Sequence, residues 1–367
     1  MRIGILTQAL HGNYGGILQN YALQQVLKQM GHTPVTIDRH RPTNDNVVKN
    51  IAKRLLQIAH GKYESSLLTH SQKQYLYSRP IEFVTAHIDR LGPLTTQSAF
   101  DNVVSDASFD AFIVGSDQCW RPCYSPNITD YFLDFADRRQ VKRIAYAVSF
   151  GVDSWEYTPQ QTQTVKKAAA NLDAVSVREK SGIKLCQEFL DINAEWVLDP
   201  TMLLGVDGFT PFVKKEYPAT PFITQYLLED SPEADAVVSR VKSLTGINEC
   251  RDNNRTKTFN RFTLLKHYSA ISVEEWISNI ANARFLVTDS FHGAVFAIMF
   301  NIPFIVKLNG TRGNTRIESL LSDFGLEQCI CRDTARFALP TIDYQAVNRH
   351  LADRLIESQT FLINALS

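Results

Sequence analysis

Five short segments of the 367-residue sequence carry side chains that could bind or transform a charged ligand. Each follows a run of apolar residues, so each is expected near the end of a strand. In open α/β sheets, ligands bind outside the carboxyl ends of the strands, and this rule selects the segments from the residues alone. The segments are residues 13–16, 115–120, 176–181, 288–294 and 309–316.

Residues 288–294 hold the main candidate for proton transfer. A strand runs into Ser290 and His292, and a very apolar helix then begins. His292 would lie in the first turn of that helix, where the positive end of the helix dipole favours an anionic ligand. The alternative is a structural histidine bonded to a backbone carbonyl, but the position at a strand tip favours a functional role.

Residues 115–120 place a carboxylate, Asp117, close to an aromatic ring, Trp120. Such a pair commonly holds a sugar, because the ring can stack on the C–H face of the sugar. Ser116 and Gln118 are the neighbouring polar groups. The alternative for Asp117 is a helix N-cap, which needs no ligand.

Three arginines follow strands and could bind a phosphate or a carboxylate. Arg178 comes directly after an apolar run, and its planar fork suits bidentate binding of such groups. A salt bridge to Glu179 is the alternative. Arg312 and Arg316 lie in a Gly-rich segment after the next strand, so we expect them near His292 unless that loop is simply solvated.

Residues 13–16 read Asn13-Tyr14-Gly15-Gly16 and form a turn before the first expected helix. Glycines let the backbone approach a ligand, and a helix N-terminus favours an anion or a sugar hydroxyl. The motif is not GxGxxG, so a dinucleotide site has little support and a plain tight turn explains it equally well. The sequence contains no Ser-His-Asp set, HExxH motif, P-loop or EF-hand loop.

The elements that must position these segments alternate between strands and helices. Strands are predicted over residues 2–8, 34–38, 109–115, 143–149, 174–177, 194–198, 221–228, 284–288 and 303–308. Helical periodicity fills most of the intervals, and βαβ units of this kind form parallel sheets. The fold class is therefore α/β, with two Rossmann-like domains that face a cleft.

The domain boundary is expected near Pro200, Gly205 and Gly208. Proline ends a regular element, and the glycines permit a hinge. Polar, helix-prone residues near 41–100 read as an insertion in the first domain. The C-terminal stretch is amphipathic and could pack back on the first domain. The expected units are residues 1–205, 206–340 and 341–367.

Composition excludes several classes of protein. Lys plus Arg and Asp plus Glu each number 38, so the surface as a whole is not built to bind nucleic acid. The longest apolar stretch, residues 294–306, falls short of the roughly 20 residues of a spanning helix. The N-terminus lacks signal-peptide features, so we expect a cytoplasmic protein. Six cysteines without CxxC spacing or a histidine cluster predict neither a disulfide framework nor a metal site.

Together, the segments resemble the polysaccharide pyruvyl transferase family. The resemblance runs in family order over roughly residues 1 to 325, and the order and spacing make the set specific. The matching pieces are Asn13-Tyr14-Gly15-Gly16 with Gln19-Asn20-Tyr21-Ala22-Leu23, Phe109-Asp110 through Gly115-Ser116-Asp117-Gln118 and Trp120, Ser176-Val177-Arg178-Glu179, Leu198-Asp199-Pro200-Thr201, and Thr288-Asp289-Ser290-Phe291-His292-Gly293 with Pro303-Phe304.

This resemblance implies an architecture like that of the glycosyltransferase-B (GT-B) fold and a defined reaction. The pyruvyl group of phosphoenolpyruvate would move onto hydroxyls of a sugar in a glycan or glycolipid precursor, forming a ketal and releasing phosphate. The sugar acceptor could be lipid-linked, which would bring the protein to a membrane surface without a membrane span. No cofactor, metal or nucleic acid is implied.

The same resemblance suggests roles for the candidate residues. Arg178, with Arg312 or Arg316, would hold the carboxylate and phosphate of the donor, close to Ser290 and Gly293. His292 would bind the phosphate and protonate it as it leaves, and Asp117 would deprotonate or position the acceptor hydroxyl. Some relatives carry an arginine where this chain has Ser290, and Arg312 or Arg316 could supply that charge. The acceptor would lie in a cleft bordered by Asn13, Tyr14, Gly15, Gly16, Ser116, Gln118 and Trp120.

Two alternatives remain open from the sequence. A glycosyltransferase would use a nucleotide-sugar donor in the same cleft and needs a base-stacking pocket, for which Gln225 and Tyr226 are the only candidates. A noncatalytic glycan-binding protein would bind sugar without a donor. The presence of Asp117, Arg178 and His292 favours an enzyme.

Overall fold

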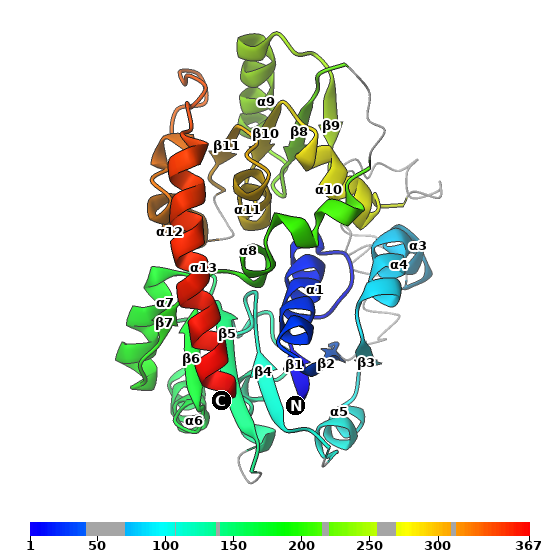
Figure 1. Ribbon diagram of the computed structural model, residues 1–367, viewed down its shortest axis with the longest axis vertical. Helices are drawn as coiled ribbons and strands as arrows, with labels where there is room; N and C mark the ends of the chain where they lie inside the picture. Colours follow the sequence, from blue (N-terminus) through cyan, green and yellow to red (C-terminus); the bar gives the residue numbers. More distant parts are fainter. Residues whose placement is uncertain (42–69, 107, 137–139, 215–219, 255–268, 310–312) are drawn as a thin grey trace, which may run out of the picture.

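The structure is a computed structural model that describes residues 1–41, 70–106, 108–136, 140–214, 220–254, 269–309 and 313–367. Within these ranges the chain forms two parallel β-sheets, which lie one above the other in Figure 1. The helices are α1 (Tyr14–Gln29), α3 (His70–Leu76), α4 (Ser78–His87), α5 (Gln97–Val104), α6 (Pro159–Ala169), α7 (Lys180–Leu185), α8 (Pro200–Leu204), α9 (Pro232–Thr245), α10 (Val273–Ala281), α11 (Phe291–Met299), α12 (Thr315–Asp323) and α13 (Tyr344–Leu366). None of these helices is long and apolar enough to cross a membrane.

The first sheet has seven described strands in the order β3-β2-β1-β4-β5-β6-β7. From β1, the next strands of the sequence, β2 and β3, extend the sheet to one side, and β4 to β7 extend it to the other side. The topological switch point therefore lies between β1 and β4. The strands are β1 (Arg2–Leu6), β2 (Thr33–Arg39), β3 (Arg90–Leu94), β4 (Ala111–Val114), β5 (Lys142–Val148), β6 (Ala174–Val177) and β7 (Glu195–Trp196).

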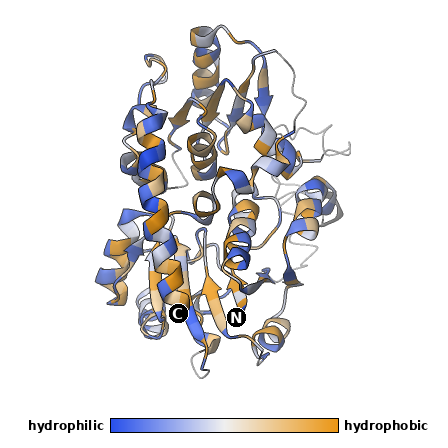
Figure 2. Ribbon diagram, viewed as in Figure 1, coloured by the Kyte–Doolittle hydropathy of each residue, from blue (hydrophilic) through white to orange (hydrophobic). Residues whose placement is uncertain are grey.

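Helices cover both faces of this sheet, which explains the continuous apolar runs of its central strands. Side chains alternate between the two faces of a strand. Ile113 therefore packs toward α1 and α13, whereas Phe112 and Val114 pack toward α5 and α6. Figure 2 shows the hydrophobic residues gathered on these central strands and on α11.

The second sheet has five described strands in the order β12-β11-β10-β8-β9. Its switch point lies between β8 and β10. The strands are β8 (Ile223–Tyr226), β9 (Cys250–Asp252), β10 (Phe285–Thr288), β11 (Phe304–Lys307) and β12 (Ile330–Cys331).

The reading of residues 41–100 as an insertion was wrong for its last part. Residues 90–94 form β3, which pairs in parallel with β2 and extends the first sheet. The strand carries Gly92 and Pro93 and lies at the sheet edge, so it lacks an apolar pattern. Residues 42–69 lie outside the described residues. The strands β9 and β12 were also not predicted, because they have only three and two residues and lie at the edges of the second sheet, too short to show a strand pattern.

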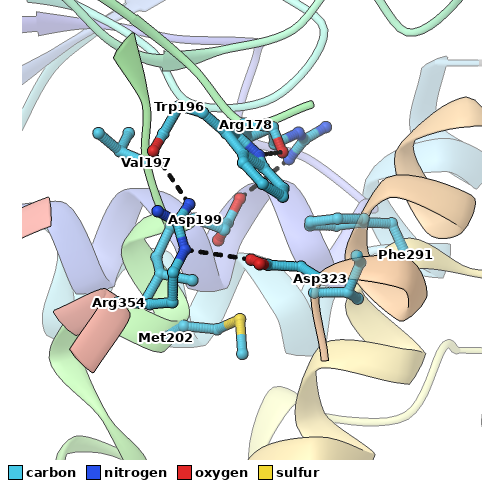
Figure 3. A pocket seen from close by; sticks show the side chains of 10 residues that line it. Arg178, Trp196, Val197, Asp199, Met202, Phe291, Asp323 and Arg354 are labelled. Atoms are coloured by element: carbon cyan, nitrogen blue, oxygen red, sulfur yellow. Dashed lines mark hydrogen bonds and ion pairs between the residues drawn. The ribbon is translucent and has the colours of Figure 1, made fainter. Parts of the chain in front are cut away.

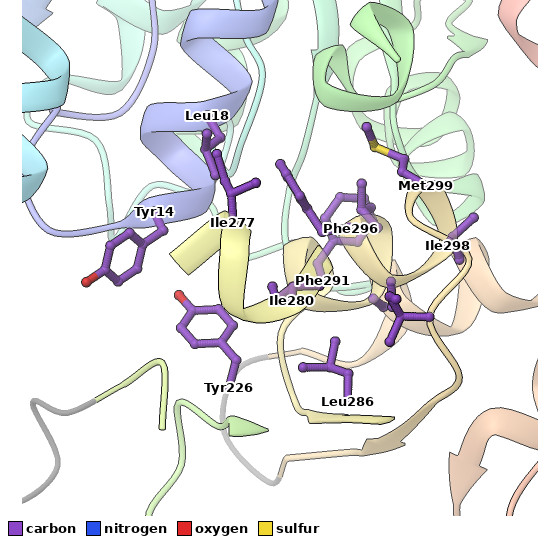
Figure 4. Close-up of a cluster of buried hydrophobic side chains, with 14 of the residues drawn as sticks. Tyr14, Leu18, Tyr226, Ile277, Ile280, Leu286, Phe291, Phe296, Ile298 and Met299 are labelled. Carbon is purple, nitrogen blue, oxygen red and sulfur yellow. The ribbon is translucent and has the colours of Figure 1, made fainter. Parts of the chain in front are cut away.

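An apolar cluster joins the two sheet-containing halves (Figure 4). The ring of Tyr14 stacks on Trp276 with 5.8 Å between centroids, and its hydroxyl donates to the carbonyl of Ile271 over 2.8 Å. Leu18 of α1 belongs to the same cluster as Ile277 of α10 and Phe296 of α11. The N-terminus of α1 is therefore packed directly against the second half of the chain.

Helix α13 also joins the halves, since it runs alongside both in Figure 1. Near its beginning, the hydroxyl of Tyr344 donates to the carbonyl of Ile302 over 2.5 Å. Near its end, Ser358 accepts a 2.9 Å hydrogen bond from the backbone N–H of Leu198, and Phe361 and Leu362 enter the core beneath the first sheet.

Candidate active site

A buried cluster of charged side chains lies where the carboxyl edges of the two sheets meet. The loop after β4 supplies Asp117, the loop after β6 supplies Arg178, and the residue before α8 is Asp199. From the other half, α11 supplies His292 and α12 supplies Arg316. All five side chains are buried.

Arg178 is the centre of this cluster. Its Nη1 donates to Oδ2 of Asp199 over 2.9 Å, and its Nη2 donates to Oδ1 of Asp117 over 3.0 Å. The guanidinium also lies 4.6 Å from the ring centroid of Phe291. Burial alone would lower the pKa of Arg178, but the surrounding carboxylates raise it, so the side chain stays cationic. The fork predicted to bind a donor is paired with two carboxylates in this conformation.

Asp117 lies at the switch point of the first sheet, as the ligand-binding rule predicts. Its Oδ2 accepts a 3.2 Å hydrogen bond from Nδ2 of Asn13, which precedes α1. Its backbone has φ 73°, a left-handed conformation that costs energy for a residue with a Cβ. Burial would raise the pKa of this carboxyl, but Arg178, His292 and Arg316 together lower it below its usual value. Asp117 is thus a charged and weakly basic carboxylate here.

Asp199 is a functional candidate that the sequence analysis missed. It caps α8: its Oδ1 accepts from the backbone N–H of Thr201 over 3.0 Å and from the hydroxyl over 2.7 Å. Its Oδ2 lies 3.0 Å from the hydroxyl of Ser116 and faces Arg178. Burial would raise the pKa of Asp199, but His292 and Arg178 hold it well below the usual range. Asp followed by Pro is itself an N-cap signal, and it could have identified this residue.

His292 lies in the first turn of α11, with Ser290 as the N-cap that accepts a bond from the N–H of Gly293. Its Nε2 is buried and makes no hydrogen bond to any described residue. The nearest carboxylate oxygen, Oδ2 of Asp199, is 3.6 Å away, which is an ion-pair distance rather than a hydrogen bond. A buried ring nitrogen without a hydrogen-bond partner lowers the free energy of unfolding, and an oxygen atom of a ligand would provide the missing partner.

Gly15 explains how α1 can approach the imidazole. A Cβ at this position would lie 2.1 Å from Nδ1 of His292, so only glycine fits there without displacing the ring. Gly16 is less constrained, because its Cβ would lie 3.1 Å from Nδ2 of Asn13. The Gly-rich turn therefore serves close packing across the two halves.

Arg316 brings a second guanidinium to the cluster from the first turn of α12. Burial, followed by the charge of Arg178, lowers the pKa of Arg316 to about 10, while Asp117 and Glu179 act in the opposite direction. Arg316 therefore lies within electrostatic reach of the groups around Arg178. Arg312, the other predicted arginine, lies outside the described residues.

Glu179 adds a third buried carboxyl group. Its Oε1 accepts hydrogen bonds from the hydroxyl of Ser149 and the N–H of Phe150, over 2.9 and 3.0 Å. Its Oε2 lies 3.9 Å from Nε of Arg178 and has no hydrogen-bond partner among the described residues. Burial raises the pKa of Glu179 above its usual value, despite the opposing effects of Arg178 and Arg316.

The prediction that Trp120 stacks on a sugar was wrong. Its ring is fully buried, stacks on Phe132 with 4.6 Å between centroids, and donates through Nε1 to the carbonyl of Tyr131 over 2.7 Å. Tyr14 is likewise buried in the contact between the two halves. Gln118 is half-buried, and its side-chain oxygen accepts a 3.3 Å bond from Arg121.

The cluster is closely packed in this conformation. A cavity of about 10 Å³ borders Arg178, Asp199 and Phe291 (Figure 3), which is room for about one water molecule. An organic anion can enter the space beside Arg178 only if side chains or helices move. The described residues include no group of three or more His, Cys, Asp or Glu side chains arranged to hold a metal ion.

Comparisons with known proteins support a family assignment and a fold. The model of the family described as "Polysaccharide pyruvyl transferase" matches residues 13–310. No curated protein matches the chain. Among solved structures, the chain is similar to a glycosyltransferase from Rickettsia africae, with TM-score 0.52, 11% identity, and coverage of 100% of this chain and 99% of that one.

Two UDP-GlcNAc 2-epimerases are similar to the same degree. The enzyme from Neisseria meningitidis, bound to UDP-GlcNAc, gives TM-score 0.51 at 9% identity and covers 100% of this chain and 99% of its own. The enzyme from Methanocaldococcus jannaschii gives TM-score 0.51 at 11% identity, with coverages of 97% and 93%. At such low identity these matches show the fold alone, and they confirm the GT-B-like α/β class.

Proposed function

The chain belongs to the polysaccharide pyruvyl transferase family, a family of transferases, and from this premise we propose that it transfers the pyruvyl group of phosphoenolpyruvate to a sugar. The acceptor is a sugar in a glycan or glycolipid precursor, and the product is a pyruvate ketal across two of its hydroxyls. The observation that carries the proposal is the buried cluster in which Arg178 joins Asp117 and Asp199 beside the unsatisfied Nε2 of His292.

The donor is a small anion with a carboxylate and a phosphate, and the cluster offers matching groups. Arg178 and Arg316 supply two guanidinium groups, whose forks suit both anions. Nε2 of His292 supplies a donor for a phosphate oxygen. The N-terminus of α11 adds its positive dipole end at the same place. Ser290 caps this helix, since its hydroxyl accepts a hydrogen bond from the backbone N–H of Gly293.

The proposed reaction balances in atoms and in protons. One sugar hydroxyl forms a bond to C2 of the donor, and C3 gains a proton to become the methyl group. The second hydroxyl then forms a bond to C2 as the C2–O bond to phosphate breaks. Two hydroxyl protons are lost, so one is matched by the proton gained at C3 and one leaves with the phosphate. In the proposed mechanism, His292 protonates the departing phosphate and Asp117 accepts a hydroxyl proton.

Donor binding would also change the basicity of Asp117, because Asp117 is paired with Arg178 in the structure. While the pair is intact, the pKa of Asp117 is held low, and the carboxylate is a poor base. A donor carboxylate that takes over Nη2 of Arg178 would release Asp117 from its 3.0 Å contact. Donor binding would then create the base that the acceptor hydroxyl needs.

A specific contact disfavours a nucleotide-sugar donor. At the switch point of the second sheet, Asp289 accepts hydrogen bonds from the backbone N–H groups of Leu228 and Glu229, over 2.6 and 2.8 Å. These adjacent N–H groups are those that would otherwise receive an anion at the carboxyl edge of the strands. A fixed carboxylate occupies both N–H groups, so they do not offer a site for a diphosphate in this conformation.

The experiment is to measure phosphate release from phosphoenolpyruvate with a panel of mono- and oligosaccharide acceptors, and to look for the ketal methyl signal by NMR. We expect acceptor-dependent phosphate release that His292→Ala removes without unfolding the protein. Full activity in His292→Ala would refute the mechanism. Binding of a sugar with neither donor binding nor phosphate release would favour the noncatalytic glycan-binding alternative.

A further inference from the structure

Arg354 of α13 lines the cavity that borders Arg178, although it comes from the far end of the sequence (Figure 3). Its Nε donates to Oδ2 of Asp323 over 3.1 Å, and its Nη2 donates to the carbonyl of Trp196 over 3.0 Å. Its guanidinium also lies 4.5 Å from the Trp196 ring centroid, so one buried side chain contacts both sheet-containing halves.

Each partner of Arg354 connects to an arginine of the candidate site. Nε1 of Trp196 donates a 3.2 Å hydrogen bond to the backbone carbonyl of Arg178. Asp323 is the last residue of α12, whose first turn carries Arg316. At a rise of about 1.5 Å per residue, these two residues are separated by about 10 Å along a single short helix. A displacement of Asp323 at one end of α12 would therefore also displace Arg316 at the other end.

The surroundings of Arg354 hold it in this position. Asp323 also accepts a 2.9 Å bond from Nε2 of His350, one turn earlier on α13. Glu357, one turn later, pairs with Nη1 of Arg354. The ring of Trp196 also contacts a second cation, because Nζ of Lys180 is 4.5 Å from its centroid. Asp323, Glu357, and the ring and carbonyl of Trp196 thus fix the guanidinium of Arg354.

We propose that Arg354 is a positioning residue for the anionic donor: it sets the spacing between Arg178 and Arg316 by clamping β7 to α12. This inference rests on the proposed function. Arg354 does not touch the donor in this arrangement. It acts through Trp196 on the backbone of Arg178 and through Asp323 on the helix that carries Arg316. Groups that hold a substrate must be placed closely, since a misplacement of about 1 Å caused far from the reacting atoms can cost about 100-fold in rate.

The test compares Arg354→Gln with Arg349→Gln, an exposed arginine on the same helix, as the matched control. KM for phosphoenolpyruvate, kcat, and the melting temperature are measured for each. We expect Arg354→Gln to raise KM for the donor about tenfold, while kcat falls much less, because the two arginines that it positions would bind the donor in the ground state as well as in the transition state. The control should match the wild type in all three quantities. A lowered melting temperature with unchanged donor KM would assign Arg354 a merely structural role and overturn the proposal.

Trp196→Phe gives an independent measurement, because it keeps an aromatic ring for Arg354 but removes the Nε1 bond to Arg178. We expect a smaller rise in donor KM, and this variant decides the question if Arg354→Gln does not fold. Unchanged donor KM in Trp196→Phe would then refute the clamp. A wild type that neither binds nor consumes phosphoenolpyruvate refutes the proposed function itself. An active wild type with unchanged KM in both variants refutes this inference alone.

Discussion

Nη2 of Arg178 donates a 3.0 Å hydrogen bond to Oδ1 of Asp117, so the expected donor-binding group and the expected base neutralise each other. Both side chains are buried, and Asp199 occupies the other terminal nitrogen of the same guanidinium. The two carboxylates and the guanidinium are therefore paired with one another. An anionic donor must compete with a carboxylate for Arg178, and the competition links donor binding to the release of Asp117.

Asp117→Asn should bind phosphoenolpyruvate more tightly than the wild type and yet turn over poorly. The variant removes the competing charge from Arg178, so donor affinity should rise several-fold. Loss of a general base should lower kcat by about 100-fold or more. Calorimetry gives the affinity, and phosphate release gives kcat.

The control for this prediction is Asp106→Asn, which removes a carboxylate that pairs with Arg2 over 2.8 Å at the amino end of β1. It should change neither quantity. Weaker donor binding in Asp117→Asn would contradict the competition between Asp117 and the donor.

Gly15→Ala should lower both stability and turnover by displacing the imidazole of His292. The new Cβ would lie 2.1 Å from Nδ1 of His292, so the ring or the start of α1 must move. Overpacking of this kind should cost about 1–3 kcal/mol of unfolding free energy, and turnover should fall because His292 is displaced. Denaturant unfolding and phosphate release measure the two effects.

Gly16→Ala is the matched control, since its Cβ would meet the side chain of Asn13 at longer distances, 3.1 Å from Nδ2 and 3.3 Å from Cγ. We expect it to be close to neutral or slightly stabilising, because alanine is the better helix former. If Gly15→Ala were as active and stable as Gly16→Ala, the close packing of α1 on His292 would be wrong.

Asp199→Asn should destabilise the fold in a pH-dependent way. Burial opposes the charged form, but His292 and Arg178 depress the pKa of Asp199 below its unfolded value. The stabilisation by this charge is therefore present above the unfolded pKa of about 4 and is lost as pH falls toward the folded value. At neutral pH the variant should lose about 3 kcal/mol of unfolding free energy, as for other broken buried pairs.

The measurement is denaturant unfolding of wild type and Asp199→Asn at neutral pH and at about pH 3, below the usual carboxyl pKa. The difference between the two proteins should shrink on acidification. A difference that stays constant or grows would show that the charge of Asp199 is not what stabilises the cluster.

Trp120→Phe should affect stability and leave acceptor binding unchanged. The smaller ring can still stack on Phe132, but the carbonyl of Tyr131 loses its 2.7 Å hydrogen bond from Nε1. An unsatisfied buried carbonyl costs about 1–3 kcal/mol of unfolding free energy. A large rise in acceptor KM with unchanged stability would contradict this and would support Trp120 as a sugar-binding ring.

The central strands could be predicted from sequence because they are buried on both faces. β1, β5 and β10 read as apolar runs, and the rule that ligands bind at strand ends selected loops that do meet, at Asp117, Arg178 and His292. Edge strands such as β3 give no such signal. Their stability comes from one pairing partner, which sequence periodicity does not reveal.

Local sequence also could not show which polar and aromatic residues become buried. Asp199 follows a strand of only two residues, β7, which gives little sign of a strand end. The Asp-Pro pair therefore predicts a domain boundary, and the sequence does not show that Asp199 belongs to a charge cluster. The sequence predicts Trp120 as a sugar-stacking ring beside Asp117, but Phe132 stacks on the ring and the carbonyl of Tyr131 accepts from its Nε1 group. Both facts depend on tertiary contacts.

The most direct measurement of the central claim is thermal unfolding with increasing phosphoenolpyruvate, beside nucleotide-sugars and NAD. A ligand at about 100 times its dissociation constant stabilises the folded state by roughly 2.7 kcal/mol, which is readily seen. We expect a saturable rise in melting temperature with phosphoenolpyruvate alone, and a much smaller rise in Arg178→Lys, which keeps the charge but loses the fork. A rise with a nucleotide-sugar and none with phosphoenolpyruvate would contradict the pyruvyl transfer proposed here.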